Sequence, residues 1–474
     1  MRLRSLLRFR LPPLTAWRLF VLLLIVALGS EYWDRDPIAI AGVLIPWPRF
    51  VLAMLITPLV AVEAARRWSA LVRVPSAMGP LLVFWLCCAL SAAGVALSPP
   101  GWGSGAQFAR TLAHLSLYVL FVYVVVKAAT WPRLFLLVRL YYALGIAAAC
   151  LAILQFVQGT FGLFPWVAPL MMRSGVYEVG AGLTVGFRAS SIFGEPSWAA
   201  RYYLHWMALA LGFWWHTRDG RHLAALLLFG LAFYVANSLL GYVMLLVFAA
   251  AVTIAQMWRR NMFSLSKRQK VWAGITAYLL FLFWFAGAAL PLPDLLDRTV
   301  SRIGLVMQGG GGSGNRFDSI FAGLEVWKTA PIVGVGLGNI SPYIVQFYTD
   351  PAYVFRSRFG SDSLYIQLLS ETGIVGLAGF LWFWGRLLWL PRGYLRFCPS
   401  TEARQAHAWL RFLQVDLLAQ AVGMLNYSDY LNPHLWTVVA IVLACRTLLV
   451  DEARHVTSPA ALPVPGLAIT GFAG

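Results

Sequence analysis

The sequence predicts an all-α, polytopic membrane protein with about twelve transmembrane helices, both termini in the cytoplasm and two long extracytoplasmic loops. Three observations lead to this prediction. Hydrophobic residues make up 60% of the 474 residues and charged residues only 12%, whereas about 25% of the residues in a soluble domain are charged. Apolar stretches recur along the chain, many near the roughly 20 residues that cross a bilayer as a helix. The basic residues lie mainly in the connections between these stretches, where they orient membrane helices.

The apolar stretches predict the helices one by one. The first stretch follows a basic start and has no small-residue cleavage site, so we expect a membrane anchor and not a cleaved signal peptide. Two stretches near the middle share one apolar run that only Asn237, Ser238 and Gly241 interrupt. The expected helices cover residues 14–29, 38–62, 79–97, 108–128, 132–157, 196–215, 222–238, 239–257, 271–290, 364–390, 409–425 and 431–450.

These helices divide the chain into six parts. Loops longer than about 15 residues on a compact scaffold are usually functional, so we expect the working surface on the two long loops, outside the cytoplasmic membrane. The expected parts are helices one to five in 1–157, the first long loop in 158–195, helices six to nine in 196–290, the second long loop with the binding arginines in 291–363, helices ten to twelve in 364–450, and a cytoplasmic tail in 451–474.

The basic residues support this topology. With the N-terminus inside, the basic connections fall on the cytoplasmic side, and the short outside connections carry only Arg35, Arg49 and Arg110. The net charge of +18 therefore reflects membrane orientation, and we expect no nucleic-acid partner. The five cysteines show no metal-site spacing, and neither a metal nor another cofactor is expected.

One charged cluster stands out, the stretch FRASSIFGEPSWAARYY from residue 187 to residue 203. Pro196 suits the first position of a helix, which makes Glu195 the expected cap residue. The N-terminus of that helix is a natural anion site. Arg188 and Arg201 could converge on it, and the arginine fork suits phosphate. The alternative is that Glu195 only caps the helix and pairs with one arginine.

Other polar features have simpler interpretations. The glycine-rich segments at 309–315 and 334–339 lack the complete nucleotide-binding patterns; the second predicts a tight turn after a helix from Arg316 to Thr329. Asp362 precedes the next membrane helix and could be an ordinary N-cap. His205, one turn after Arg201, is expected to be a packed structural histidine. Asp416 is expected near a helix end, which argues against an ion-coupled carrier with acidic groups at the bilayer midplane.

Three stretches together resemble the superfamily of O-antigen ligases and Wzy-type polysaccharide polymerases of bacterial inner membranes. They are R-x-S-S-I-F-G-E-P-S at 188–197, G-N-R-F-D-S-I-F-A-G-L-E-V-W-K-T-A-P-I-V-G-V-G-L-G-N at 314–339, and D-S-L-Y-I-Q-L-L-S-E-T-G-I-V-G at 362–376. The resemblance covers roughly residues 185–380 and implies a multi-pass enzyme whose active site faces the periplasm. Its expected partners are an undecaprenyl-diphosphate-linked oligosaccharide, the lipid bilayer and a chain-length regulator protein.

The resemblance also implies residue roles. Arg188 and Arg316 match arginines thought to hold the diphosphate, and Glu195 stands where other members carry an Asn or an acid before Pro. The chain has Asp362 and Ser363 where ligases carry His-Asn, which favours a polymerase. Glu195 points the same way, because the F-G-E-P-S stretch resembles exopolysaccharide polymerases.

The implied reaction is attack by a sugar hydroxyl on the anomeric carbon of the lipid-linked glycan. The catalytic base would be Glu195 or Asp362. The arginines expected to bind the diphosphate, the glycan or the carrier are Arg188, Arg316, Arg201, Arg302, Arg356 and Arg358. Two alternatives stay open: an O-antigen ligase or protein O-oligosaccharyltransferase that uses the same donor, and a transporter such as a lipid-linked oligosaccharide flippase.

Overall fold

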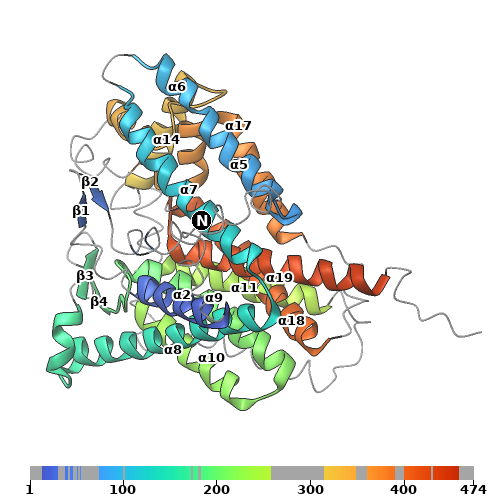
Figure 1. Cartoon of the computed structure of the whole chain (residues 1–474). Helices are drawn as coiled ribbons and strands as arrows, with labels where there is room; N and C mark the ends of the chain where they lie inside the picture. The colour runs from blue at the N-terminus through green and yellow to red at the C-terminus, as the bar shows by residue number, and fades with distance from the viewer. Residues whose placement is uncertain are drawn as a thin grey trace, which may run out of the picture.

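The computed structural model describes residues 13–29, 38–40, 43–45, 51, 54, 74–99, 102–171, 175–179, 183–257, 314–348, 360–389, 400–428 and 431–457. Long helices form the body of the molecule (Figure 1). Within these described residues, five segments are long and apolar enough to cross a membrane: Ser76–Leu97, Gly105–Lys127, Trp131–Phe161, Leu364–Leu388 and Pro433–Ala453. The structure therefore agrees with an all-α membrane protein, whereas the count of about twelve spans and their orientation stay predictions.

The described helices follow the apolar stretches closely, with shifted ends. Helix α8 continues into the first expected loop, and α18 begins ahead of its apolar stretch. The expected helix at 271–290 lies outside the described residues. The α-helices are α2 Pro13–Gly29, α5 Gly79–Leu90, α6 Ala92–Leu97, α7 Gly105–Lys127, α8 Trp131–Phe161, α9 Pro196–Thr217, α10 Gly220–Ala236, α11 Leu239–Met257, α14 Gly314–Thr329, α15 Ile340–Ile344, α17 Leu364–Leu388, α18 Thr401–Gly423 and α19 Pro433–Thr457. The 3-10 helices are η2 Ser76–Met78, η3 Pro165–Met171, η4 Val345–Phe347 and η7 Met424–Asn426.

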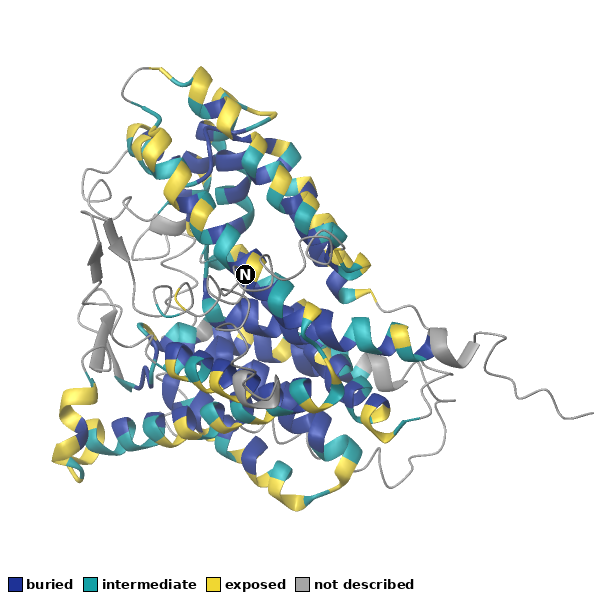
Figure 2. Ribbon diagram, viewed as in Figure 1, coloured by how far each residue is buried: buried dark blue, intermediate teal, exposed yellow. Residues whose placement is uncertain are grey.

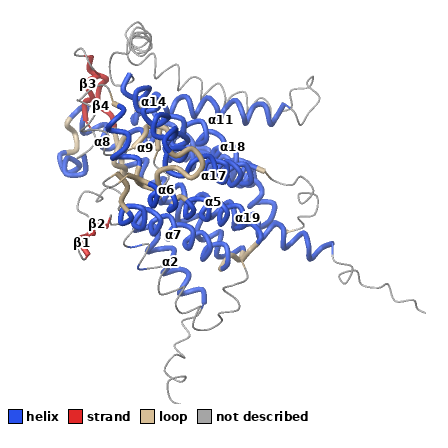
Figure 3. Tube along the Cα trace, turned by 90° about the horizontal axis from the view of Figure 1, so that it is seen from above, coloured by secondary structure: helices blue, strands red, loops and turns tan. Residues whose placement is uncertain are grey.

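Two short antiparallel hairpins lie at one edge of the helices, as the view from above shows (Figure 3). Strands β1 (Ile38–Ile40) and β2 (Val43–Ile45) pair with Ala39 opposite Leu44. The expected helix at 38–62 is therefore wrong in its first part. A short apolar run rich in β-branched residues does not distinguish strand from helix by its pattern.

The second hairpin lies within the first long loop. Strand β3 (Gly175–Val179) pairs with β4 (Leu183–Arg188), and Gly175 lies opposite Arg188. The structure thus supplies regular elements, η3 and this hairpin, in a loop for which the sequence predicted none. The hairpin delivers Arg188 to the segment that leads into α9.

The two apolar stretches that share one run in the middle of the chain form two separate helices, α10 and α11. Asn237 ends α10 with a left-handed backbone, φ 43°, a conformation that asparagine tolerates better than most residues. Ser238 then accepts a hydrogen bond from the Gly241 N–H group at 3.2 Å. The break expected at Asn237 and Ser238 is therefore where the chain turns.

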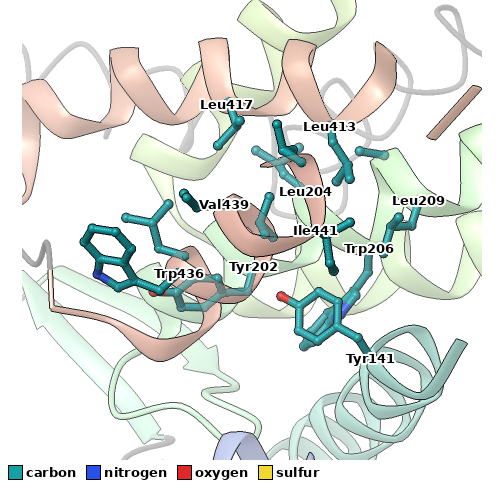
Figure 4. Packing of buried hydrophobic residues seen from close by; sticks show 14 of the residues in the cluster. Tyr141, Tyr202, Leu204, Trp206, Leu209, Leu413, Leu417, Trp436, Val439 and Ile441 are labelled. Carbon is teal, nitrogen blue, oxygen red and sulfur yellow. The ribbon is translucent and has the colours of Figure 1, made fainter. Parts of the chain in front are cut away.

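Helix α9 is the most enclosed element of the described structure. Every residue from Ala199 to Phe213 is buried, and α8, α10, α11 and α18 surround it; the dark core of Figure 2 follows this region. A helix that is buried on all sides is normally apolar all round. Figure 4 shows Leu204 of this helix near Leu413 of α18, and Trp206 beside Tyr141 of α8, with ring centres 5.7 Å apart.

Hydrogen bonds between helix ends define two ends of the bundle. At one end, which we call the motif end, Gln155 near the end of α8 bonds to Ser191, and the Leu364 N–H group of α17 bonds to the Tyr427 carbonyl after α18 at 3.0 Å. At the opposite end, Trp131 of α8 bonds to Glu452 of α19 at 3.2 Å. The sequence motifs noted above all lie toward the motif end.

Helix α17 is broken near its first third. Gly373 has φ 64° and ψ −168°, so the helical hydrogen bonds cannot pass through it. The segment Pro331–Gly336 replaces them: Val335 and Gly336 donate to the carbonyls of Ser370 and Glu371 at 3.0 and 2.9 Å, and Ile374 donates to the Pro331 carbonyl at 3.0 Å. An interrupted helix in a membrane protein is stable only when the freed backbone groups are paired in this way.

Gly334 fits into this break because it has no side chain. Its φ is +72°, and a Cβ atom on it would lie 2.3 Å from the Glu371 carbonyl carbon. No rearrangement of a flexible side chain relieves that contact, because the obstructing atoms belong to the backbone. The tight turn expected after the Arg316 helix is present, and its glycines allow it to reach the broken helix.

We predict that Gly334→Ala destabilises the fold by at least about 2 kcal/mol, because alanine is strained at this φ and collides with the α17 backbone. The control is Gly385→Ala in α17, where an added Cβ meets nothing within 4 Å. Thermal unfolding of the detergent-solubilised variants measures both. Equal midpoints for the two variants would contradict the proposed role of the turn.

Candidate functional site

The segment between β4 and α9 is held in a fixed shape. Ser191 has a left-handed backbone, φ 57°, which is unfavourable for a residue with a side chain. Gln155 of α8 accepts from the Ser191 N–H group at 2.7 Å and donates to its carbonyl at 3.1 Å. The Ser191 hydroxyl donates to the Ala148 carbonyl at 2.6 Å. The middle of the first motif is therefore a buried turn that three hydrogen bonds to Ser191 hold in one conformation.

Arg188 is half-buried and Glu195 is exposed, and they lie on either side of this buried turn. The Arg188 Nε atom donates to the Ala236 carbonyl at the end of α10 at 3.2 Å. Glu195 is exposed and occupies the N-cap position of α9, followed by Pro196 in the first turn. Its carboxylate makes no capping hydrogen bond. The expected cap position is thus correct, and the Glu195 carbonyl accepts the first helical bonds from Trp198 and Ala199 at 3.0 and 3.2 Å, but the side chain does not cap the helix.

Arg201 lies in the second turn of α9 and is only 2% exposed. Its guanidinium carbon lies 3.6 Å from the centre of the Tyr427 ring and 5.5 Å from that of Tyr202. A cation stacked on an aromatic face is stabilised by the negative potential of the ring. The arginine charge is therefore held against aromatic rings at the motif end.

A chain of polar contacts continues from Arg201 into the core. The Gln420 side chain donates to the Arg201 carbonyl at 3.1 Å and to the Asp416 carboxylate at 3.3 Å. Asp416 also contacts His205 Nδ1, and both side chains are fully buried. His205 is a packed histidine, as expected, but it is packed against a carboxylate. Buried ionisable groups in membrane proteins are normally paired in this way.

Asp416 corrects one expectation from the sequence. It lies well inside α18, which runs from Thr401 to Gly423, and not near a helix end. The last residue of α18 lies about two turns beyond Asp416, whose side chain is fully buried against His205. The absence of a deeply buried acid was an argument against a transporter, and Asp416 removes that argument.

The second and third motifs meet at the start of α17. The Asp362 N–H group donates to the Ser319 hydroxyl of α14 at 2.8 Å, and Ser319 follows Arg316 by three residues in the sequence. Ser363, not Asp362, occupies the N-cap position of α17, and Asp362 itself is exposed. Asp362 is therefore not an ordinary N-cap.

Part of the expected site lies outside the described residues. Arg302, Arg356 and Arg358 fall in undescribed segments, and only the backbone of Arg316 is described. Their expected roles in binding the diphosphate, the glycan or the carrier stay predictions. Among the described residues, no group of three His, Cys, Asp or Glu side chains could hold a metal ion.

Sequence reasoning missed Tyr427 and Gln420. Tyr427 contacts Arg201 through its ring, and its carbonyl accepts from Leu364 N–H at the start of α17. The available signal was the pair Asp416 and Gln420, four residues apart in an otherwise apolar stretch, because polar residues at helical spacing in a membrane segment indicate a paired interior face.

These contacts connect all three motifs at the motif end. The Ser319 hydroxyl accepts from the Asp362 N–H group, and the Leu364 N–H group donates to the Tyr427 carbonyl. The Tyr427 ring contacts Arg201 in α9, the helix that follows Arg188 and Glu195. Cationic and carboxylate side chains are thereby gathered at one end of a helical membrane bundle. The molecule is, as a class, a helical membrane protein with a charged site at one end.

Residues 224–381 match the family model described as O-antigen ligase. The resemblance to the superfamily of O-antigen ligases and Wzy-type polymerases is confirmed over this segment, which is about a third of the chain. No protein with a curated description matches the chain. The matched segment includes Arg316 and Asp362, whereas Arg188 and Glu195 precede it.

Proposed function

We propose that the protein is a polysaccharide polymerase. It transfers a glycan from an undecaprenyl-diphosphate-linked donor to a sugar hydroxyl of a second lipid-linked oligosaccharide, at the periplasmic face of the bacterial inner membrane. The observation that carries the proposal is the contact path from Ser319 through Asp362, Leu364 and Tyr427 to Arg201. It joins the three motifs that resemble the family at one end of the bundle.

The chemistry requires little beyond charge stabilisation and one base. The acceptor hydroxyl forms a new bond to the anomeric carbon, the bond from that carbon to the diphosphate breaks, and undecaprenyl diphosphate leaves with the bonding electrons. Arg188, Arg201 and Arg316 stabilise the negative charge on the leaving diphosphate. The hydroxyl proton passes to a carboxylate, Glu195 or Asp362, both of which are exposed or outside the helix body.

The distribution of basic residues supports a periplasmic motif end. Basic residues gather at the opposite end of the helices, as expected for the cytoplasmic side. There Arg221 hydrogen-bonds Asp219 at 2.8 Å, and this contact lowers the pKa of the Asp219 carboxyl group. The basic side chains at the opposite end are Lys127, Arg133, Arg218, Arg221, Arg386 and Arg446.

A polymerase is favoured over a ligase by the residues at the start of α17. Asp362 and Ser363 stand where the ligases that the chain resembles carry His-Asn. Asp362 offers an exposed carboxylate there, which can accept a proton but does not supply the imidazole associated with the ligase reaction. A ligase or a protein O-oligosaccharyltransferase would use the same donor and differ in its acceptor.

A lipid-linked oligosaccharide transporter is the second candidate. The fully buried contact between His205 and Asp416 favours it, because coupled carriers use paired ionisable groups inside the membrane. The polymerase remains the better account, since Gln420 ties the same Asp416 to the Arg201 carbonyl. In that role, the buried pair supports the helix that carries Arg201.

We predict that the double variant Arg188→Ala, Arg316→Ala abolishes polymer formation while the protein remains at its normal level in the membrane. Loss of two donors to the leaving diphosphate should lower the rate by at least about 10³-fold. The assay is polymer length on gels, in cells whose own copy has been deleted. Arg221→Ala, at the opposite end, is the matched control and should leave the polymer unchanged. Full-length polymer from the double variant would contradict the diphosphate site.

We predict that removal of the catalytic base lowers the rate by about 10²–10⁴-fold, and the isosteric pair Glu195→Gln and Asp362→Asn identifies it. Each substitution removes the proton acceptor and keeps the shape of the side chain. One variant should lose polymer and the other should retain it. The initial rate of glycan transfer by purified protein measures the difference. Rates near wild type for both variants would show that neither carboxylate is the base.

A further inference from the structure

Tyr427 joins three parts of the site that are far apart in the sequence. Its ring lies 3.6 Å from the Arg201 guanidinium carbon, in a face-on arrangement at van der Waals distance. Its backbone carbonyl accepts from the Leu364 N–H group at 3.0 Å, two residues after Asp362. The same residue therefore contacts the buried arginine of α9 and fixes the start of α17.

The ring is itself held in place by the helix that precedes it, α18. The Tyr427 hydroxyl donates to the Gln420 side-chain oxygen at 3.1 Å, and the Gln420 amide donates to the Arg201 carbonyl at 3.1 Å. A closed loop results, from the Arg201 backbone through Gln420 to the ring and back to the Arg201 guanidinium. These contacts hold the ring against the guanidinium group of α9, and the direct ring contact sets the plane of that group.

The orientation of that plane matters for an anion. A guanidinium group stacked on a ring is stabilised through its face, while all of its N–H donors point outward in its own plane. A diphosphate binds in that plane through paired hydrogen bonds. Arg201 can therefore stack on Tyr427 and bind a diphosphate at the same time. Stacking orients the plane of the guanidinium group before the diphosphate binds.

We propose that Tyr427 is a positioning residue for Arg201, which it holds in the orientation that binds the donor diphosphate. This proposal rests on the proposed function, because it assumes that Arg201 meets a diphosphate. Tyr427 acts through the arginine and does not touch the reacting atoms. Its aromatic face carries the main effect because it contacts the guanidinium group directly, and the hydroxyl bond to Gln420 adds only a small restraint on the ring.

The test compares Tyr427→Phe with Tyr427→Leu in purified, full-length protein. Both variants lose the hydroxyl group, and only the second loses the aromatic face. The probe is undecaprenyl diphosphate in detergent micelles, with binding followed by intrinsic fluorescence. We expect the Kd of the phenylalanine variant to lie within about threefold of wild type, and that of the leucine variant to rise about five- to thirtyfold.

A second comparison separates positioning from packing. In the Arg201→Met background, the phenylalanine and leucine variants should bind equally weakly, because the ring has no cation to orient. If the leucine variant does not fold, fluorinated phenylalanines incorporated at position 427 take its place. Successive fluorines weaken the negative face of the ring at nearly constant shape, so the Kd should rise stepwise with fluorination.

The outcomes distinguish this proposal from the proposed function. Failure of wild-type protein to bind undecaprenyl diphosphate overturns the diphosphate site and the positioning role together. Binding by wild type with equal Kd values for the phenylalanine and leucine variants, or for all fluorinated rings, overturns the positioning role alone. The positioning role is also overturned if Tyr427→Leu raises the Kd by the same factor in the Arg201→Met background as in the wild-type background.

Discussion

The arrangement of the site depends on the break in α17. At Gly373 the helix gives up its own hydrogen bonds, and the backbone of Pro331–Gly336 supplies replacements at Ser370, Glu371 and Ile374. In the low dielectric of a membrane, unpaired backbone groups would be too unfavourable to persist. The pairing therefore ties the segment after α14 to α17, and it sets Ser319 where it meets Asp362.

A second constraint operates around α9. This helix is enclosed by its neighbours, yet it carries Arg201 and His205. Both are accommodated because α18 presents matching polar groups, with Asp416 against His205 and Gln420 against the Arg201 backbone. Replacing one partner of such a buried pair is usually more unfavourable than replacing both with apolar residues. The polar residues Asp416 and Gln420 of α18 thus allow the enclosed helix α9 to carry Arg201 at the motif end.

Much of this organisation could be predicted from the sequence, and the failures have physical reasons. Apolar runs located the described helices, and Pro196 located the start of α9. The pattern failed in 38–45, where a short β-branched run forms a hairpin, and at Asp416, whose buried partner His205 lies on a different helix. Tyr427 could not be found from a local pattern, because its partners Arg201 and Leu364 are distant in the sequence and become neighbours only through helix packing.

The most direct test of this account is reconstitution of the purified protein in liposomes with a single lipid-linked repeat unit and no ion gradient. The account predicts that the repeat unit is lengthened and that one undecaprenyl diphosphate is released for each glycosidic bond formed, because the donor already carries the activation energy. Movement of the intact lipid-linked unit across the bilayer, with no new glycosidic bond, would contradict it.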